Sequence, residues 1–250
     1  MKPATKARLH CINQEFYQTF ARSFASTRRR IQPGVRRIMQ GIPERGNWLD
    51  IGCGSGALAV EWLRQKRQGV YFGVDFSSSL IAEAGEEIRG LARTADLEIQ
   101  FQAVDLVNDG WEKPLKNILW DGALCFAVLH HIPGADQREK ICAAIAHLLG
   151  RGKSLYLSVW QVNNSPRLMQ RIQPWRLAEV DEADLEAGDV LMDWRAESGD
   201  VNHQNGLRYV HIFEESELNS LAKTAGFEVV GSFLSDGREG NLGLYQTWKT

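Results

Sequence analysis

The residues best placed to do chemistry surround a glycine-rich turn in the segment NWLDIGCGSGALAVEWL, which contains Asp50. A buried strand is expected to run into Gly52, Gly54 and Gly56 and then directly into a helix. Glycines suit this turn because the backbone bends tightly and a ligand can approach without a Cβ in the way. The start of the helix adds N–H donors and positive potential. The sequence therefore predicts a binding site for an anionic or polar group.

Two further carboxylates are expected at the carboxyl ends of the next strands. Asp75 ends the run YFGVDFS, nineteen residues beyond Gly56, where a carboxylate can accept both hydroxyls of a ribose. Asp105 ends the run FQAVDL, where an acidic side chain can accept from an adenine amino group. Because open α/β sheets bind ligands at this edge, the three strand ends predict one nucleoside-shaped crevice.

Two cofactor classes and a structural role compete for the glycine turn. Gly52, Gly54 and Ala57 also satisfy the dinucleotide pattern G-x-G-x-x-G/A, which would place a pyrophosphate there. The position of Asp50 before the first glycine, and of Asp105 after the third strand, fits S-adenosylmethionine (SAM) better. We therefore favour SAM over a nicotinamide or flavin nucleotide and over a purely structural turn.

The elements that must position these residues alternate along the chain from residue 47. Alternating β-rich and helical runs are typical of βαβ units and a mostly parallel sheet. We expect strands at 48–51, 70–75, 98–104, 122–126 and 154–160, and helices at 57–68, 78–92 and 137–149. A helix at 215–225 precedes β-rich runs at 227–234 and 242–248, which we expect to form an antiparallel hairpin at the sheet edge.

Two regions lie outside this pattern. Residues 1–46 are expected to be a basic helical extension, with helices near 13–26 and 35–40, and residues 47–250 the main domain. Residues 161–206 form a long polar interval, which we expect to be an insert of the lid type or disordered. The extension carries ten Lys and Arg against two Glu, so it could meet a polyanion, whereas residues 179–200 carry nine acidic residues against one Arg.

The composition is that of an ordinary globular protein, with 44% hydrophobic and 24% charged residues and a net charge of −2. No apolar run is long enough to span a bilayer, and the N-terminus lacks the apolar core of a signal peptide, so we expect a cytoplasmic protein without a membrane partner. The four cysteines show no metal-ligand spacing, and we expect no metal site.

These motifs resemble those of the class I SAM-dependent methyltransferases, over roughly residues 45 to 160. The resemblance rests on LDIGCGSG, GVDFS, the strand end at Asp105 and WDGALCFAVLHHI. It implies a Rossmann-like α/β fold with a mostly parallel seven-stranded sheet, a C-terminal antiparallel hairpin, N-terminal helices and an insert. The resemblance also implies SAM as cofactor, held by Asp50, Gly52, Cys53, Gly54, Gly56, Asp75, Phe76, Asp105, Leu106 and Phe126.

Segments outside that core resemble the tRNA wobble-uridine carboxymethyl O-methyltransferases. The segments are FARSFASTRRR, AVLHHI, LYLSVWQ, DVLMDWR and RYVHIFEESEL. The resemblance implies tRNA as substrate and, as in eukaryotic members, a possible small activator subunit. An ionised carboxylate needs cationic or hydrogen-bonding clamps rather than a base. Our candidates for contacting the substrate are Arg28, His130, Arg208, Tyr209 and His211.

The sequence thus predicts a SAM-dependent O-methyltransferase that esterifies the carboxylate of a carboxymethyl-modified wobble uridine in tRNA. Two alternatives stay open at this point. One is a methyltransferase for a small-molecule carboxylate or phenol, with the insert as a lid. The other is a non-catalytic SAM-binding or partner-regulating protein.

Overall fold

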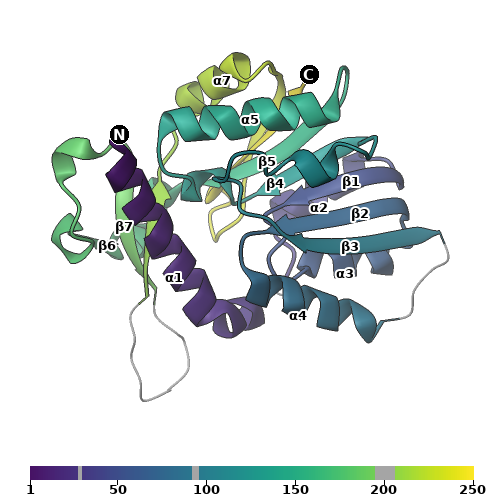
Figure 1. The fold of residues 1–250 in the computed structure, drawn as a ribbon, viewed down its shortest axis with the longest axis horizontal. Helices are drawn as coiled ribbons and strands as arrows, with labels where there is room; N and C mark the ends of the chain where they lie inside the picture. Colours follow the sequence, from purple (N-terminus) through teal and green to yellow (C-terminus); the bar gives the residue numbers. More distant parts are fainter. Residues whose placement is uncertain (28–29, 92–95, 195–205) are drawn as a thin grey trace.

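A computed structural model describes residues 1–27, 30–91, 96–194 and 206–250. Its main feature is a seven-stranded sheet in the order β3-β2-β1-β4-β5-β10-β9, shown in Figure 1 beside a smaller three-stranded sheet. The main strands are β1 (Arg45–Ile51), β2 (Gln68–Asp75), β3 (Leu97–Ala103), β4 (Gly122–Phe126), β5 (Ser154–Trp160), β9 (Glu228–Ser235) and β10 (Gly243–Lys249).

The sheet is parallel from β3 through β5 and antiparallel at its C-terminal end. β10 pairs antiparallel with both β5 and β9, so the last strand of the chain lies between them. The expected parallel sheet with a C-terminal antiparallel hairpin is therefore confirmed. The hairpin does not simply extend the edge, because its second strand lies inside the sheet and its first strand forms the edge.

Helices cover both faces of this sheet (Figure 1). α5 (Ala135–Leu149) and α7 (Glu215–Thr224) lie on one face, and α2 (Pro33–Gly41), α3 (Ala57–Arg64) and α4 (Ser78–Arg89) lie on the other. Side chains alternate between the faces along each strand: Leu49 and Ile51 join the α5 face, whereas Trp48 joins the α3 face. Asp50, between Leu49 and Ile51, must therefore point to the same face as Trp48. α3 ends four residues earlier than expected.

The described part of the insert, residues 161–194, forms a small antiparallel sheet together with the strand that follows the insert. Its strands are β6 (Ile172–Gln173), β7 (Asp189–Trp194) and β8 (Gly206–His211), preceded by the short helix α6 (Pro166–Met169). The β7–β8 register pairs Met192 with Arg208. The sequence predicted an insert of the lid type or a disordered segment at 161–206, and it did not predict this sheet.

The long helix α1 (Pro3–Thr27) joins the small sheet to the main one. In Figure 1 it runs between the two sheets, with its far end beside α4. An apolar stripe at helical spacing, Leu9 and Ile12, packs with Leu191 and Tyr209 of the small sheet. The first helix thus begins about ten residues before its expected start, and its residues complete the core of the insert. Among the described residues, every helix is too short or too polar to cross a bilayer.

Candidate active site

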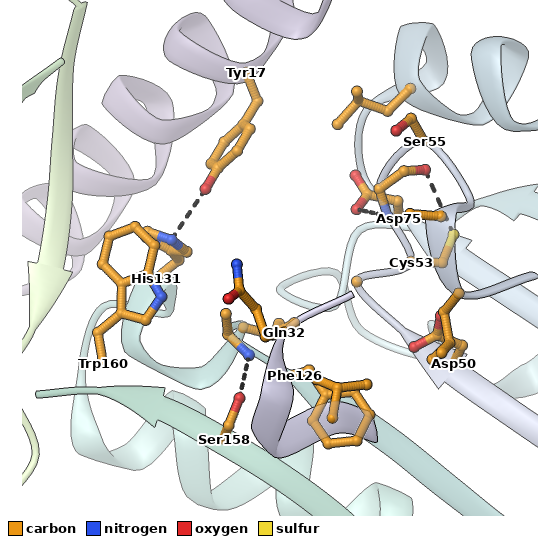
Figure 2. A pocket seen from close by; sticks show the side chains of 18 of the residues that line it. Tyr17, Gln32, Asp50, Cys53, Ser55, Asp75, Phe126, His131, Ser158 and Trp160 are labelled. Carbon is orange, nitrogen blue, oxygen red and sulfur yellow. Dashed lines mark hydrogen bonds between the residues drawn. The ribbon is translucent and has the colours of Figure 1, made fainter. Parts of the chain in front are cut away.

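A cavity of about 440 Å³ opens at the carboxyl ends of β1 to β5, which is a size typical of small-molecule sites. In Figure 2, the glycine-turn residues lie on one side of the cavity, and Tyr17, His131 and Trp160 lie on the other. The turn supplies Gly52, Cys53 and Gly54 to the wall. The strand ends that the sequence predicts to converge are thus brought together.

The turn adopts the left-handed backbone that its glycines permit. Gly52 has φ of 72° and Gly54 has φ of 55°. A Cβ on Gly52 would lie 2.2 Å from a Val128 methyl, whereas a Cβ on Gly54 would meet no described atom within 4 Å. Gly54 therefore leaves open space toward the cavity. Gly56 has φ of 77° and caps the start of α3 without being part of the cavity wall.

Asp50 is buried at the base of the cavity and accepts a hydrogen bond from the Tyr71 hydroxyl. Burial raises the pKa of Asp50 to about 7, against the Tyr71 hydrogen bond, which lowers it. A cation arriving in the cavity would favour the ionised form. The ammonium group of a bound methionine moiety is such a cation.

Asp75 is buried at the end of β2, and its two oxygens accept from backbone amides. Oδ2 accepts from the Gly54 N–H at 3.0 Å and Oδ1 from the Ser77 N–H at 2.9 Å. Burial raises the pKa of Asp75 to about 6, against these hydrogen bonds. These two hydrogen bonds fix the orientation of the carboxylate. Each oxygen keeps a second lone pair, so the carboxylate can still accept from the hydroxyls of a ribose.

Asp105 is held by the N-terminal helix, which the sequence analysis did not anticipate. Its Oδ2 lies 2.9 Å from His10 Nε2 and 3.1 Å from Gln14 Nε2, and its Oδ1 accepts from the Val107 N–H. Burial alone would raise the pKa of Asp105, but the hydrogen bonds outweigh it and leave that pKa below its usual range. The carboxylate that we expect at the adenine is therefore ionised and already oriented.

The remaining residues expected at the cofactor also lie at the cavity. Phe76, Leu106 and Phe126 all contribute to its wall. Phe126 is the last residue of β4, and its ring faces the cavity in Figure 2. An aromatic ring in that position can stabilise the positive sulfonium of SAM. The set of donors, carboxylates and open backbone fits this cofactor.

Arg208 is the expected substrate clamp that the structure places in the cavity wall. It is 4% exposed, with its guanidinium carbon 4.6 Å from the ring centre of Trp160 and 5.4 Å from that of Phe16. Stacking on aromatic faces orients a guanidinium, and burial strengthens its field. This arrangement offers a fixed positive charge to an anionic group inside the cavity.

Tyr17 and His131 form a hydrogen-bonded pair across the cavity wall, a pairing that the sequence did not predict. Tyr17 Oη lies 3.0 Å from His131 Nε2, and His131 Nδ1 lies 3.1 Å from the backbone oxygen of Tyr209. A carbonyl only accepts, so Nδ1 carries the proton, and in a neutral ring Tyr17 donates to Nε2. Asn13 donates to the backbone oxygens of His131 and Tyr209 and fixes this geometry. His10, Asn13 and Tyr17 recur at helical spacing, the one signal that could have found them.

Three of the candidates for contacting substrate lie away from the cavity. Tyr209 and His211 point to the other face of β8 from Arg208, because neighbouring strand residues alternate. Both bind Asp189, through the Tyr209 hydroxyl and His211 Nδ1, each at 2.7 Å. His130 is fully buried against Trp160. We therefore keep none of the three as a substrate contact, and Arg28 lies outside the described residues.

His211 belongs to a partly buried cluster of charged side chains. Its ligand atoms lie within 4.8 Å of those of Glu186 and Asp189, close enough for one metal ion to bridge. However, Arg138 donates to Glu186 at 2.8 Å and lies 3.4 Å from Glu217, so a guanidinium already supplies positive charge there. We assign this cluster to the packing of α5 and α7 on the insert.

Comparison with known proteins identifies the family and agrees with the fold. A family model described as a methyltransferase domain matches residues 23–232. A SAM-dependent methyltransferase from Methanosarcina mazei shares the fold with a TM-score of 0.64 and 23% identity, over 88% of this chain and 98% of that one. Magnesium protoporphyrin IX methyltransferase from Synechocystis, solved with S-adenosylhomocysteine, gives a TM-score of 0.58 at 16% identity, over 96% and 98%.

Two of the curated relatives are named as tRNA methyltransferases. The tRNA (carboxymethyluridine(34)-5-O)-methyltransferase of Schizosaccharomyces pombe is 25% identical over 232 residues, which are 89% of this chain and 90% of that protein. The mouse enzyme of the same activity is 28% identical over 146 residues, which are 58% of this chain; the match spans only 19% of that longer protein.

The chain belongs to the methyltransferase-domain family, since the family model covers most of its length. With the strand order, the glycine turn and the carboxylates at the strand ends, it is a class I SAM-dependent methyltransferase.

Proposed function

We propose that this enzyme transfers the methyl group of SAM to a carboxylate oxygen, and that the carboxylate belongs to a carboxymethylated wobble uridine in tRNA. The buried guanidinium of Arg208, in the wall of the cavity that Asp50 and Asp75 also line, carries this proposal. Similarity over most of its length to the fission yeast tRNA enzyme supports the RNA substrate.

To esterify a carboxylate, the protein must mainly position the carboxylate and the methyl group. A carboxylate with a pKa near 4 is ionised at neutral pH, so no base must remove a proton before it attacks. SAM supplies an electrophilic methyl group when bound. Arg208 would hold the carboxylate in line with that methyl, and correct orientation can contribute on the order of 7–11 kcal/mol. The guanidinium fork pairs well with two carboxylate oxygens.

Two attributes of the proposed function stay predictions. The first is a small activator subunit, as the resemblance to eukaryotic tRNA enzymes implies. The second is the cytoplasm as the place of action. A pull-down of the tagged chain from its native cells would test the first, and fractionation of the same cells would test the second.

The decisive experiment uses tritiated SAM and tRNA that carries 5-carboxymethyluridine at the wobble position. We expect label in tRNA that mild base releases as methanol, because an ester hydrolyses there. Arg208→Gln should lower kcat/KM by about 10- to 100-fold, the loss expected when a charged hydrogen bond disappears. Arg208→Lys, which keeps the charge but not the fork, should recover part of the rate.

Arg151→Gln is the matched control, because Arg151 is exposed in the turn before β5, at the opposite edge of the sheet. SAM affinity, measured separately, shows whether the Arg208 variants keep the cofactor site. If tRNA takes no base-labile label, or if Arg208→Gln is as active as Arg151→Gln, the proposal fails.

A second candidate function is methylation of a hydroxyl on a small molecule. The hydrogen-bonded pair of Tyr17 and His131 favours it, because both side chains line the cavity. A hydroxyl proton could pass to Tyr17 Oη while the Tyr17 proton passes to His131 Nε2. The oxygen would then form its bond to the methyl carbon as the carbon–sulfur bond breaks. A carboxylate acceptor needs no such pair.

Tyr17→Phe separates the two candidates. For a hydroxyl acceptor, kcat should fall about 100-fold or more, since general base catalysis typically contributes that much. For a carboxylate acceptor, Tyr17→Phe should change KM more than kcat. Tyr156→Phe in β5, whose side chain lies outside the cavity wall, is the control for losing a phenol hydroxyl.

A further inference from the structure

The hydroxyl of Tyr245, in the last strand β10, is the junction of a hydrogen-bond chain in the cavity wall. It donates to Asp236 Oδ2 at 2.5 Å. Burial and then this hydrogen bond raise the pKa of Tyr245 above its usual range, against hydrogen bonds with Ser158 and the Val35 backbone, which lower it. A hydroxyl with one proton and two lone pairs can make all three contacts. The hydrogen-bonding capacity of this oxygen is therefore used within the protein.

One branch of the chain reaches the end of β4. The Ala127 N–H donates to Ser158 Oγ at 3.1 Å and to the Ser158 backbone oxygen at 3.0 Å, and Figure 2 shows the Ser158 side chain accepting this bond beside Phe126. Ala127 has a φ of 57°, a left-handed conformation that costs a residue with a Cβ about 1–2 kcal/mol. Both residues line the cavity. Ser158 therefore holds the backbone just after Phe126, the ring expected beside the sulfonium.

The other branch caps the first turn of α2. Gln32, at the N-cap position, makes no side-chain cap, so the first N–H groups of the helix need other acceptors. Asp236 Oδ1 accepts from the Gly34 N–H at 2.9 Å. The Tyr245 hydroxyl bonds with the backbone of Val35, the next residue. A carboxylate also suits the positive end of a helix. Two residues from the far end of the chain thus supply the cap.

The start of α2 also packs directly on the ring of Tyr245. A Cβ on Gly34 would lie 2.3 Å from two carbons of that ring. The Phe233 ring stacks on Tyr245 with their centres 5.0 Å apart, and the guanidinium carbon of Arg37 lies 4.1 Å from the centre of Phe233. Val35, in the same turn of α2, lines the cavity. The position of this part of the cavity wall therefore depends on Tyr245.

We propose that Tyr245 is a positioning residue for SAM, whose hydroxyl holds the start of α2 and the end of β4 at the separation that the cofactor requires. Val35 and Ala127 line the cavity from these two elements, and Tyr245 lines it between them in the hydrogen-bond chain. A ligand binds more tightly when its site is already ordered. The inference concerns the methyl donor alone, so it holds for a carboxylate or a hydroxyl acceptor.

The test measures SAM affinity by isothermal titration, and the melting temperature without SAM, for Tyr245→Phe in the full chain. The change removes the hydroxyl and keeps the ring that packs on Gly34. We expect SAM to bind about tenfold more weakly, because the two sides of the cavity lose their link. Tyr209→Phe is the matched control. The Tyr209 hydroxyl donates to Asp189 at 2.7 Å, and the residue is also buried but lies outside the cavity wall. The control should lower the melting temperature and leave SAM affinity unchanged.

A pair of glycine variants tests the same contact from α2. Gly34→Ala places a methyl group against the Tyr245 ring and should displace the helix. Gly41→Ala, at the end of the same helix, meets no described atom within 4 Å. We expect Gly34→Ala to weaken SAM binding by about tenfold or more, and Gly41→Ala to leave it unchanged. This pair decides the question if Tyr245→Phe does not fold.

A double variant tests the hydrogen-bond chain itself. Ser158→Ala alone should weaken SAM binding by about 2- to 5-fold. Adding it to Tyr245→Phe should cost little more, because the two hydroxyls act as a unit. The inference is overturned if Tyr245→Phe binds SAM as tightly as Tyr209→Phe does, whatever its melting temperature. It is also overturned if the losses from Ser158→Ala and Tyr245→Phe simply multiply in the double variant.

Discussion

His10 of α1 lies 2.9 Å from the carboxylate of Asp105, which follows β3 and stands 95 residues away in the chain. Gln14, one turn further along α1, donates to the same oxygen at 3.1 Å. The N-terminal helix therefore closes over the end of the cavity where the adenine of SAM is expected. We therefore expect binding of the cofactor and docking of α1 to be linked through this carboxylate.

This contact predicts that His10→Ala weakens SAM binding, although His10 need not touch the cofactor. The change removes one hydrogen bond that orients Asp105, so we expect a loss of about 2- to 10-fold in affinity, as one hydrogen bond contributes about 0.5–1.5 kcal/mol. Isothermal titration with SAM measures it. His147→Ala, on α5 away from the cavity, is the control. Tighter binding by His10→Ala would instead mean that His10 competes with the adenine.

The cofactor side of this site could be predicted from the sequence because its signals are local. Gly52 and Gly54 follow a buried strand within a few residues, and Asp75 and Asp105 each end a β-rich run. Parallel strands bring such ends to one edge, so the topology alone gathers them. The strand order and the cavity agree with that expectation.

The acceptor side could not be predicted in the same way, because its contacts are long-range. Tyr17 meets His131 across 114 residues, and Asn13 meets Tyr209 across 196. Arg208 and Tyr209 were both expected to contact the substrate. Side chains alternate along a strand, however, so these two neighbours point to opposite faces. That alternation was available from the sequence once β8 was recognised as a strand.

The raised pKa of Asp50 predicts that SAM affinity depends on pH. With a pKa of about 7 in the cofactor-free protein, Asp50 is largely protonated at pH 5.5 and must lose its proton to face the methionine ammonium. Affinity should therefore fall by roughly tenfold or more from pH 7.5 to pH 5.5. Titration in buffers of different ionisation enthalpy should show proton release at pH 6. Equal affinity at both pH values, with no proton released, would contradict the assignment.

The same buried carboxylate predicts a stability gain for Asp50→Asn without cofactor. The folded pKa of about 7 lies above the ordinary value of 3.8, so wild-type loses stability as pH rises between them. Asp50→Asn removes that loss and keeps an oxygen for the Tyr71 hydroxyl. Its melting temperature should exceed that of wild-type by several degrees at pH 8 and by less at pH 5. Tyr71→Phe should instead lower the melting temperature at pH 8. A gain in the melting temperature of Asp50→Asn that did not depend on pH would refute the explanation.

The glycine turn predicts different defects for two neighbouring substitutions. Gly52→Ala places a Cβ 2.2 Å from Val128 Cγ2 at a φ of 72°, so we expect a loss of about 2–4 kcal/mol in unfolding free energy. A Cβ at Gly54 would meet no described atom within 4 Å. Gly54→Ala should therefore lose only about 1–2 kcal/mol in unfolding free energy, from its φ of 55°. Its methyl group enters the cavity, so SAM affinity should fall far more than stability.

Denaturant unfolding and SAM titration of both variants separate the two effects. Gly52→Ala combined with Val128→Ala should regain the part of the stability that the steric clash costs, because the second change removes the methyl that is met. The left-handed backbone keeps its own cost in the double variant, so recovery should be partial. Equal stability losses for Gly52→Ala and Gly54→Ala would show that backbone conformation alone, and not contact with Val128, makes glycine necessary at the first position.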